Sequence, residues 1–293
     1  MILFWFTLSA VAYSLLYVLI DQVIYRSKTT AFQNMNHKKK HDYVSRVLSV
    51  IHAILVTATS SVACFFICDN PKDTIFSSMQ CFENPTVFAA FTEVITVGYL
   101  SFDFIVTAFI IKDYSTLGMQ TYAHHVTAIV TFTMALLLNN QGGYLTAAMG
   151  NQHTEISTPF LHARQFLFIH TTIPFHSFLK VLNSVFFFFF FLFGRFIFQL
   201  RLTWVFFSWL SVEYQTKWGT PLYGNFEKFM LPFCIFCQIG MILLNSYWLQ
   251  LILKQIVRNF SGKSTTVKDI QEEIQEDGAQ EKKNKKKETK KNK

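Results

Sequence analysis

The stretch Tyr122-Ala-His124-His125-Val-Thr127 lies inside an apolar run that extends from Gln120 to Leu138. A second polar motif, His153-Thr-Glu155-Ile-Ser157-Thr158-Pro159-Phe-Leu-His162-Ala-Arg164, fills the centre of another apolar run. Ionisable side chains are costly in hydrocarbon, and where they occur there they usually mark functional positions. We therefore take these two motifs as the candidate site and the rest of the chain as the scaffold that holds them.

The composition is typical of a protein that crosses a membrane several times. Of the 293 residues, 51% are hydrophobic and 17% aromatic, and the mean hydropathy is +0.29. Apolar windows of about 20 residues recur along the chain, the length that a helix needs to cross a hydrocarbon layer of about 30 Å. The sequence predicts an all-α fold, a polytopic transmembrane helical bundle of about seven spans.

The predicted spans follow one another with short polar connections. They cover Ile2–Ile24, Tyr43–Cys68, Val87–Ile111, Gln120–Leu138, Tyr144–His170, Phe175–Leu210 and Phe229–Val257. The fifth fails a simple hydropathy test, but polar residues are tolerated at this depth where they face the interior of a bundle. The sixth is either one long tilted helix or two short ones. We count it once, because an odd number of spans keeps both basic regions of the chain on the same side of the membrane.

The net charge of +8 is concentrated in the loop after the first span and in the tail after Lys282. Basic residues beside membrane helices mark the cytosolic side, so this charge does not require a nucleic-acid partner, and we predict none. The chain then divides into three parts. Residues 1–42 form the first span and a basic cytosolic loop, residues 43–258 a transmembrane domain, and residues 259–293 a disordered, charged cytosolic tail.

The chain ends in Lys290-Lys291-Asn292-Lys293, with lysines at the third and fourth positions from the end. This pattern resembles the dilysine signal that returns membrane proteins to the endoplasmic reticulum, a signal that coat machinery reads in the cytosol. The alternative is that a lysine-rich block produces the pattern by chance. We predict a multi-pass protein of the endoplasmic-reticulum membrane with its C-terminus in the cytosol.

The cysteines allow one disulfide and one close pair. If the loop from Asp69 to Pro85 is lumenal, Cys68 and Cys81 can form a disulfide. Cys234 and Cys237 lie inside the last apolar run, where the alternatives are a redox-active pair and cysteines that only fill the core. We favour the packing role for this second pair.

The third span brings a carboxylate to the depth of the histidine pair. Asp103 lies roughly 12 Å, and the histidines roughly 7 Å, from the cytosolic ends of their helices at about 1.5 Å per residue. A carboxylate beside an imidazole fixes its tautomer and raises its basicity, as general acid–base catalysis requires. Adjacent residues on a helix are turned by about 100°, so His124 and His125 cannot both point at one partner. For Glu93 on the same span we favour a helix-packing role.

The fifth segment places Glu155, Thr158 and His162 on one helical face, with Pro159 loosening the backbone between them. Such residues can instead join helices through hydrogen bonds worth about 1 kcal/mol each. His, Asp and Glu are also metal ligands, but no His-x-x-x-His spacing puts two of these histidines on one helical face, so we predict no metal site.

Five short motifs, taken in order, resemble the TLC domain. They are Lys112-Asp113-Tyr114, His124-His125 with Thr127, Gly143, Glu155-Ile-Ser157-Thr158-Pro159-Phe160 with Arg164, and Phe193-Gly194-Arg195. The resemblance extends from about Tyr43 to Val257. This family includes the ceramide synthases and several TLC domain-containing proteins of lipid homeostasis.

Ceramide synthases of this family join a fatty acyl-CoA to the amine of a sphingoid base with their paired histidines. The resemblance therefore implies acyl-CoA as a co-substrate, without a bound cofactor. The catalytic residues that we infer are His124, His125, Asp103 and Glu155. The substrate-binding residues that we infer are Ser157, Thr158, His162, Arg164 and Arg195.

Two functions follow from the resemblance. The first is an N-acyltransferase of the endoplasmic reticulum. The second is a non-catalytic lipid-sensing protein, or one sorted between the endoplasmic reticulum and the Golgi. It is favoured because this chain reads Thr154-Glu155-Ile-Ser157-Thr158 where ceramide synthases have a histidine–aspartate phrase and a second aspartate. The predicted partners are membrane lipids, acyl-CoA, a sphingoid base and the coat machinery, and we leave a homodimer open.

Overall fold

The computed structural model describes residues 2–26, 30–33, 35–138, 142–217 and 224–260. The helices in order are α1 Ile2–Arg26, α2 Thr30–Gln33, α3 His37–Phe65, α4 Met79–Glu83, α5 Val87–Ile105, η1 Val106–Ile111, α6 Thr116–Leu137, α7 Gly142–Gln152, η2 His153–Ser157, α8 Thr158–Ile169, α9 His176–Phe189, η3 Phe190–Ile197, α10 Phe198–Lys217 and α11 Asn225–Phe260. None of these described elements is a strand, and the predicted all-α fold is confirmed.

Polar residues cap the helices where the chain enters them. The side chains of Asn36, Thr86 and Ser115 each accept a hydrogen bond from the backbone amide three residues further on, at the starts of α3, α5 and α6. These caps satisfy amide groups that have no partner inside the helix. After η1, Lys112 adopts a left-handed conformation (φ 54°) that ends the helix and turns the chain towards α6.

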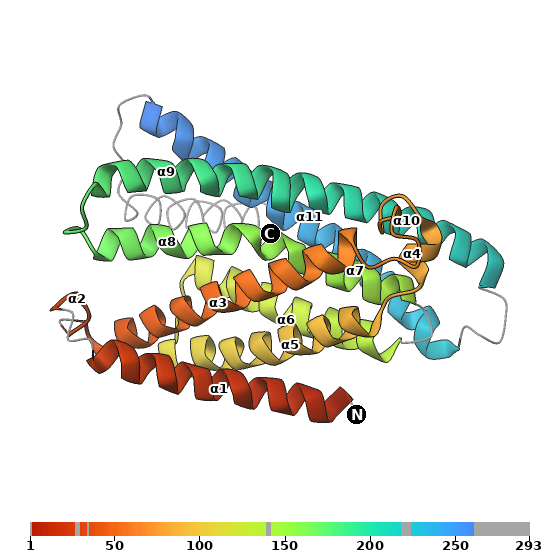
Figure 1. Cartoon of the computed structure of the whole chain (residues 1–293), viewed down its shortest axis with the longest axis horizontal. Helices are drawn as coiled ribbons and strands as arrows, with labels where there is room; N and C mark the ends of the chain where they lie inside the picture. The colour runs from red at the N-terminus through yellow and green to blue at the C-terminus, as the bar shows by residue number, and fades with distance from the viewer. Residues whose placement is uncertain (1, 27–29, 34, 139–141, 218–223, 261–293) are drawn as a thin grey trace, which may run out of the picture.

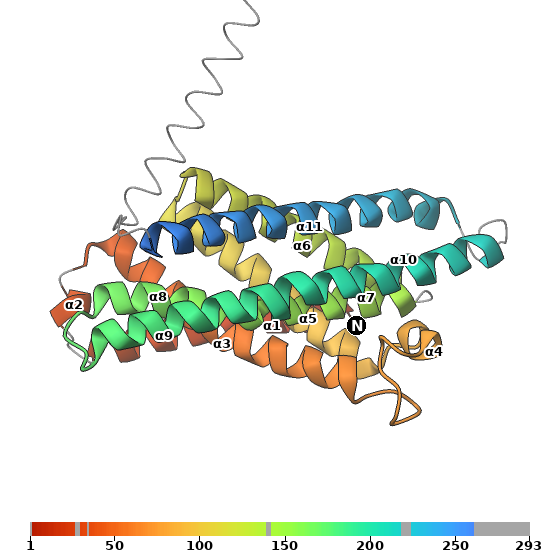
Figure 2. The ribbon, with the colours of Figure 1, turned by 90° about the horizontal axis from the view of Figure 1, so that it is seen from above.

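The long helices lie roughly alongside one another in a bundle (Figures 1 and 2). α1 packs on α3 and α5, and α5 packs on α6. On the other side of the bundle, α9, η3 and α10 form one continuous helix that covers α8, η2 and α7. The sixth predicted span is therefore one long helix, as we counted it.

Within the described residues, five helices are long and apolar enough to cross a membrane. They are Leu3–Arg26, His37–Phe65, Val87–Ile111, His176–Thr216 and Pro232–Val257. A multi-pass membrane fold is thus confirmed, with a count slightly below the predicted seven. The two remaining predicted spans correspond to α6 and to α7, η2 and α8, where polar and ionisable side chains interrupt the apolar sequence.

The loop after α3 is held by a disulfide. Cys68 and Cys81 are bonded, with their Cα atoms 5.4 Å apart, so this predicted pairing is confirmed. Cys234 and Cys237 are buried on α11 and form no disulfide. The dilysine motif, and the rest of the predicted tail from residue 261 on, lie outside the described residues.

Close packing of α7 against α10 depends on a glycine. A Cβ atom at Gly143 would lie 2.6 Å from Cδ2 and 2.7 Å from Cζ2 of Trp209. The Trp209 ring is almost fully buried, and its indole N–H donates to Glu83 Oε1 at 3.0 Å. The ring is therefore held on two sides and has little room to move.

We expect Gly143→Ala to lower the thermal stability of the detergent-purified protein. Overpacking a tight contact costs about 1–3 kcal/mol. Gly240→Ala is the matched control, because a Cβ there meets nothing within 4 Å. Equal melting temperatures for the two variants would contradict this account of the α7–α10 contact.

Candidate functional site

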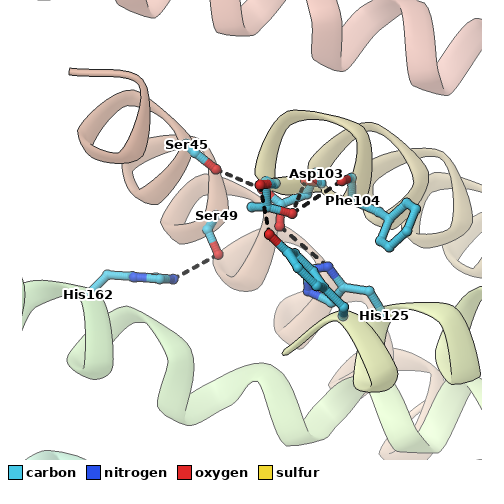
Figure 3. A network of polar contacts seen from close by, with 8 residues as sticks. Ser45, Ser49, Asp103, Phe104, His125 and His162 are labelled. Carbon is cyan, nitrogen blue, oxygen red and sulfur yellow. Dashed lines mark hydrogen bonds and ion pairs between the residues drawn. The ribbon is translucent and has the colours of Figure 1, made fainter. Parts of the chain in front are cut away.

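Asp103 joins three helices below the surface of the bundle. Its Oδ1 accepts a hydrogen bond from Ser45 Oγ on α3 at 2.7 Å, and its Oδ2 lies 3.6 Å from His125 Nδ1 on α6 (Figure 3). Asp103 and His125 are both buried. The structure thus brings together the carboxylate and one of the two histidines that the sequence singled out.

The second histidine points to a different partner. The rings of His124 and His125 have centroids 5.8 Å apart and planes inclined by 51°. His124 packs edge-on against Trp248 of α11 at 6.1 Å, and its buried Nδ1 has no hydrogen-bond partner among the described residues. The two histidines therefore face different parts of the interior, His125 towards Asp103 and His124 towards α11.

Glu155 and Arg195 form a second polar cluster beside His124. Glu155 Oε2 accepts a short hydrogen bond of 2.5 Å from Thr158 Oγ1, and Glu155 Oε1 lies 4.0 Å from Arg195 Nη2. The guanidinium of Arg195 lies over the Trp248 ring, 5.2 Å from its centroid. The oxygens of Glu155, which we inferred to be a catalytic residue, face Thr158 and Arg195 in the structure.

Three irregular helical segments surround these clusters. η1, which follows Asp103, and η3, which contains Arg195, are π-helical, and η2, which contains Glu155, is a 3₁₀-helix. Segments of this kind inside longer helices are frequent at functional sites, because they turn side chains away from the regular positions. Gly194 lets η3 approach η2 closely, since a Cβ there would meet Ile156 Cγ2.

Pro159 lies where the helical run from α7 to α8 changes type. It is in the first turn of α8, directly after the 3₁₀ segment η2. Proline is tolerated at this position because an amide hydrogen there would have no partner inside the helix. The change of helix type before Pro159 also alters the face that Glu155 presents relative to His162.

The remaining predicted substrate-binding residues are not all at one place. Ser157 is fully buried beside Glu155, and its hydroxyl has no hydrogen-bond partner within the described part of the chain. His162 Nε2 lies 2.9 Å from Ser49 Oγ on α3 (Figure 3). Arg164 Nη2 donates to Gln255 Oε1 on α11 at 3.4 Å, towards the end of that helix. Arg164 therefore belongs to a helix contact rather than to either cluster.

Glu93 lies at the contact between α5 and α7, in line with the helix-packing role that we favoured. Its side chain is fully buried, and neither carboxyl oxygen has a hydrogen-bond partner of normal geometry in the described residues. The neighbouring side chain is Gln152 of α7, which is buried as well. The contact joins α5 and α7 by burial rather than by a well-formed hydrogen bond.

The arrangement supports proton transfer better than metal binding. In the ranges that the structure describes, no three His, Cys, Asp or Glu side chains are grouped closely enough to hold a metal ion. An imidazole whose one nitrogen faces a carboxylate has its other nitrogen available to accept or donate a proton. His125 has this arrangement, and His124 lies next to it without a polar partner on Nδ1.

Sequence reasoning missed residues on α3 and α11. Ser45 and Ser49 hold Asp103 and His162, and Trp248 lies between His124 and Arg195. The signal available was weak, because serines are common in apolar helices. The segment Asn245-Ser-Tyr-Trp248 is one place where polar and aromatic residues interrupt the last apolar run.

The model of the TLC domain family matches residues 42–254, most of the chain and all of the site. No curated protein matches this sequence.

A double-mutant cycle tests the contact between Asp103 and His125. We expect Asp103→Asn and His125→Gln to couple by about 0.5–3 kcal/mol in the free energy of unfolding, as residues in direct contact do. The control cycle pairs Asp103→Asn with His153→Gln, because His153 instead contacts Ser61 Oγ at 3.0 Å. The control should be additive within about 0.5 kcal/mol. Additivity in both cycles would show that the Asp103–His125 contact does not form.

Proposed function

The chain belongs to the TLC domain family, and we propose that it is an acyl-CoA-dependent N-acyltransferase of the endoplasmic-reticulum membrane. The family places it among multi-pass membrane proteins of lipid metabolism and homeostasis. The observation that carries the proposal is the buried contact of Asp103 with His125, with His124 beside it. Intramembrane ionisable groups arranged in this way are a functional site by default.

In the proposed reaction His125 is the general base. It takes a proton from the amine of a sphingoid base as the amine nitrogen attacks the thioester carbonyl of the acyl-CoA. The C–N bond forms, the C–S bond breaks, and the proton passes to the departing thiolate. Asp103 orients the imidazole and stabilises its charged form, and Ser45 fixes the carboxylate for this role. His124 is the alternative base or acyl acceptor.

The proposed orientation puts the C-terminus in the cytosol. The basic loop around α2 and the start of α3 lies at the same end of the bundle as the end of α11 (Figure 1). Basic residues favour the cytosolic side, so both regions are assigned to it. The disulfide between Cys68 and Cys81, which follows the opposite end of α3, then falls in the oxidising lumen.

The second candidate is a non-catalytic lipid-sensing or sorting protein. It is favoured by Glu155, which is bound to Thr158 and faces Arg195 rather than a histidine. In this version the polar clusters bind a lipid headgroup and hold the helices together, and the C-terminal dilysine cycles the protein between compartments.

The transferase proposal predicts turnover of acyl-CoA and a sphingoid base by the purified protein. His125→Ala should lower kcat at least about 100-fold, because general acid–base catalysis contributes 10²–10⁴-fold. His124→Ala should also lower it. His153→Ala is the control, since this buried histidine packs on Phe198 instead and should leave turnover near the wild-type value. If the wild-type protein is no faster than His125→Ala, the chain is not this transferase.

The location is tested by Lys290→Ala/Lys291→Ala in the full-length chain expressed in cells. We expect the tagged protein to shift from the endoplasmic reticulum to later compartments in fluorescence microscopy. Lys285→Ala/Lys286→Ala removes the same charge at a position that a dilysine signal does not use. A shift of both variants, or of neither, would count against retrieval by the dilysine motif.

A further inference from the structure

Arg195 is a buried cation whose partners satisfy only part of it. The residue is 6% exposed, within a helix long and apolar enough to cross a membrane. The only acid that it approaches in the described chain is Glu155 at 4.0 Å, a distance longer than a hydrogen bond. The Nε–H of Arg195 has no hydrogen-bond partner there, and Glu155 Oε2 is already bound to Thr158. The guanidinium therefore retains donors for another group.

Other donors without partners lie on the neighbouring elements. Asn245 of α11 is fully buried, and neither Oδ1 nor Nδ2 of its amide group has a hydrogen-bond partner within the part of the chain that the structure describes. It precedes Trp248 by three residues, so the helical period places it on the same side of α11 as the ring that faces Arg195. The buried hydroxyl of Ser157, in η2, is likewise unpartnered, and η2 packs directly on η3.

Unpartnered buried polar groups are rare in protein interiors, and each needs an explanation, of which a bound ligand is one. The groups here are a guanidinium, an amide NH₂ and a hydroxyl, all of which donate hydrogen bonds. Such a set matches a group with several acceptor oxygens and a negative charge, and arginine suits planar carboxylate and phosphate geometry in particular. Asn245 Oδ1 and the Ser157 hydroxyl could also accept a hydrogen bond, but the full positive charge of Arg195 favours an anionic ligand over a cationic one.

We propose that Arg195, Asn245 and Ser157 bind the anionic group of a lipid, a carboxylate or a phosphate, inside the bundle next to His124. Trp248 of α11 forms one wall of this site. The sequence did not identify this residue as part of a site. The inference shares one assumption with the proposed function, namely that a lipid binds in the interior of the bundle. It does not depend on the transfer reaction, and it names the chemistry of the lipid group that lies beside the histidines.

The test measures direct binding of four radiolabelled lipids to the full-length protein in nanodiscs of zwitterionic lipid. Oleate and oleyl alcohol share a chain and differ in the carboxylate, and dioleoyl phosphatidate and dioleoylglycerol differ in the phosphate. We expect at least one anionic lipid to bind about 10-fold or more tightly than its neutral counterpart, the effect of charge-assisted hydrogen bonds. The pair that shows the preference identifies the anionic group as carboxylate or phosphate.

Arg195→Gln should abolish this preference. Arg201→Gln should keep it, because Arg201 is exposed on α10 and contacts the backbone oxygen of Phe76. Equal binding of anionic and neutral lipids by the wild type would overturn the proposal. Equal loss in the two arginine variants would overturn it as well, because it would indicate general attraction to positive charge.

Asn245→Leu separates a ligand role from a structural one if Arg195→Gln fails to fold. Replacing an unpartnered buried amide by an apolar side chain of similar size should leave the melting temperature without lipid unchanged or higher. The preference for the anionic lipid should still fall. A lower melting temperature with the preference intact would overturn the assignment of Asn245. Anionic binding without acyl transfer would contradict only the proposed transferase.

Discussion

The contact of Asp103 with Ser45 and His125 is the interaction on which the site depends. It joins α3, α5 and α6 at a buried position, where the Asp103 carboxylate has little contact with water. An isolated charge there is costly, so burial of the Asp103 carboxylate requires that the other two side chains lie beside it. Their meeting fixes the relative rotation of three helices. It also presents the neighbouring His124 to the other half of the bundle.

The other half is organised around Arg195. The continuous helix from α9 to α10 is regular on both sides of η3, and the π-helical turn carries the buried arginine towards Glu155 and Trp248. Gly194 is what lets this turn lie against η2. Two clusters thus flank the histidine pair. One is built on the Asp103 carboxylate, and the other on Arg195, which lies near Glu155 and whose Nε–H has no hydrogen-bond partner in the described part of the chain.

Much of the fold follows from the sequence because the hydrocarbon of a membrane offers no hydrogen bonds to the backbone. In hydrocarbon, backbone groups must be satisfied within each segment, so apolar runs become helices and breakers such as Lys112-Asp113 become turns. The bounds of α1, α3 and the α5–η1 helix were close to those expected. The predicted count of seven spans was slightly above the five helices that qualify in the described residues. The two others, α6 and the run from α7 to α8, carry polar residues that lower their hydropathy. The sequence allowed a link between Cys68 and Cys81 on the condition that their loop is lumenal, and the structure contains this disulfide.

The site was predictable only in part. The depths of Asp103 and the histidine pair along two adjacent spans predicted that they lie close together, and the helical period predicted that the two histidines diverge. Which histidine faces Asp103 was left open, and the structure shows that it is His125. The partners of Glu155 could not be, because the 3₁₀ turn before Pro159 changes the face on which it lies. The contributions of Ser45 and Trp248 depend on which helices become neighbours in space, and helical periodicity within one span carries no such information.

The central claim is that the interior between Asp103 and Arg195 receives a lipid. A cryo-electron-microscopy structure of the protein with a non-hydrolysable acyl-CoA tests it most directly. The account predicts density for an acyl chain inside the bundle, with its polar end beside His124, His125 and Arg195. Density confined to the outer surface, with the same side chains closed over an empty interior, would contradict it.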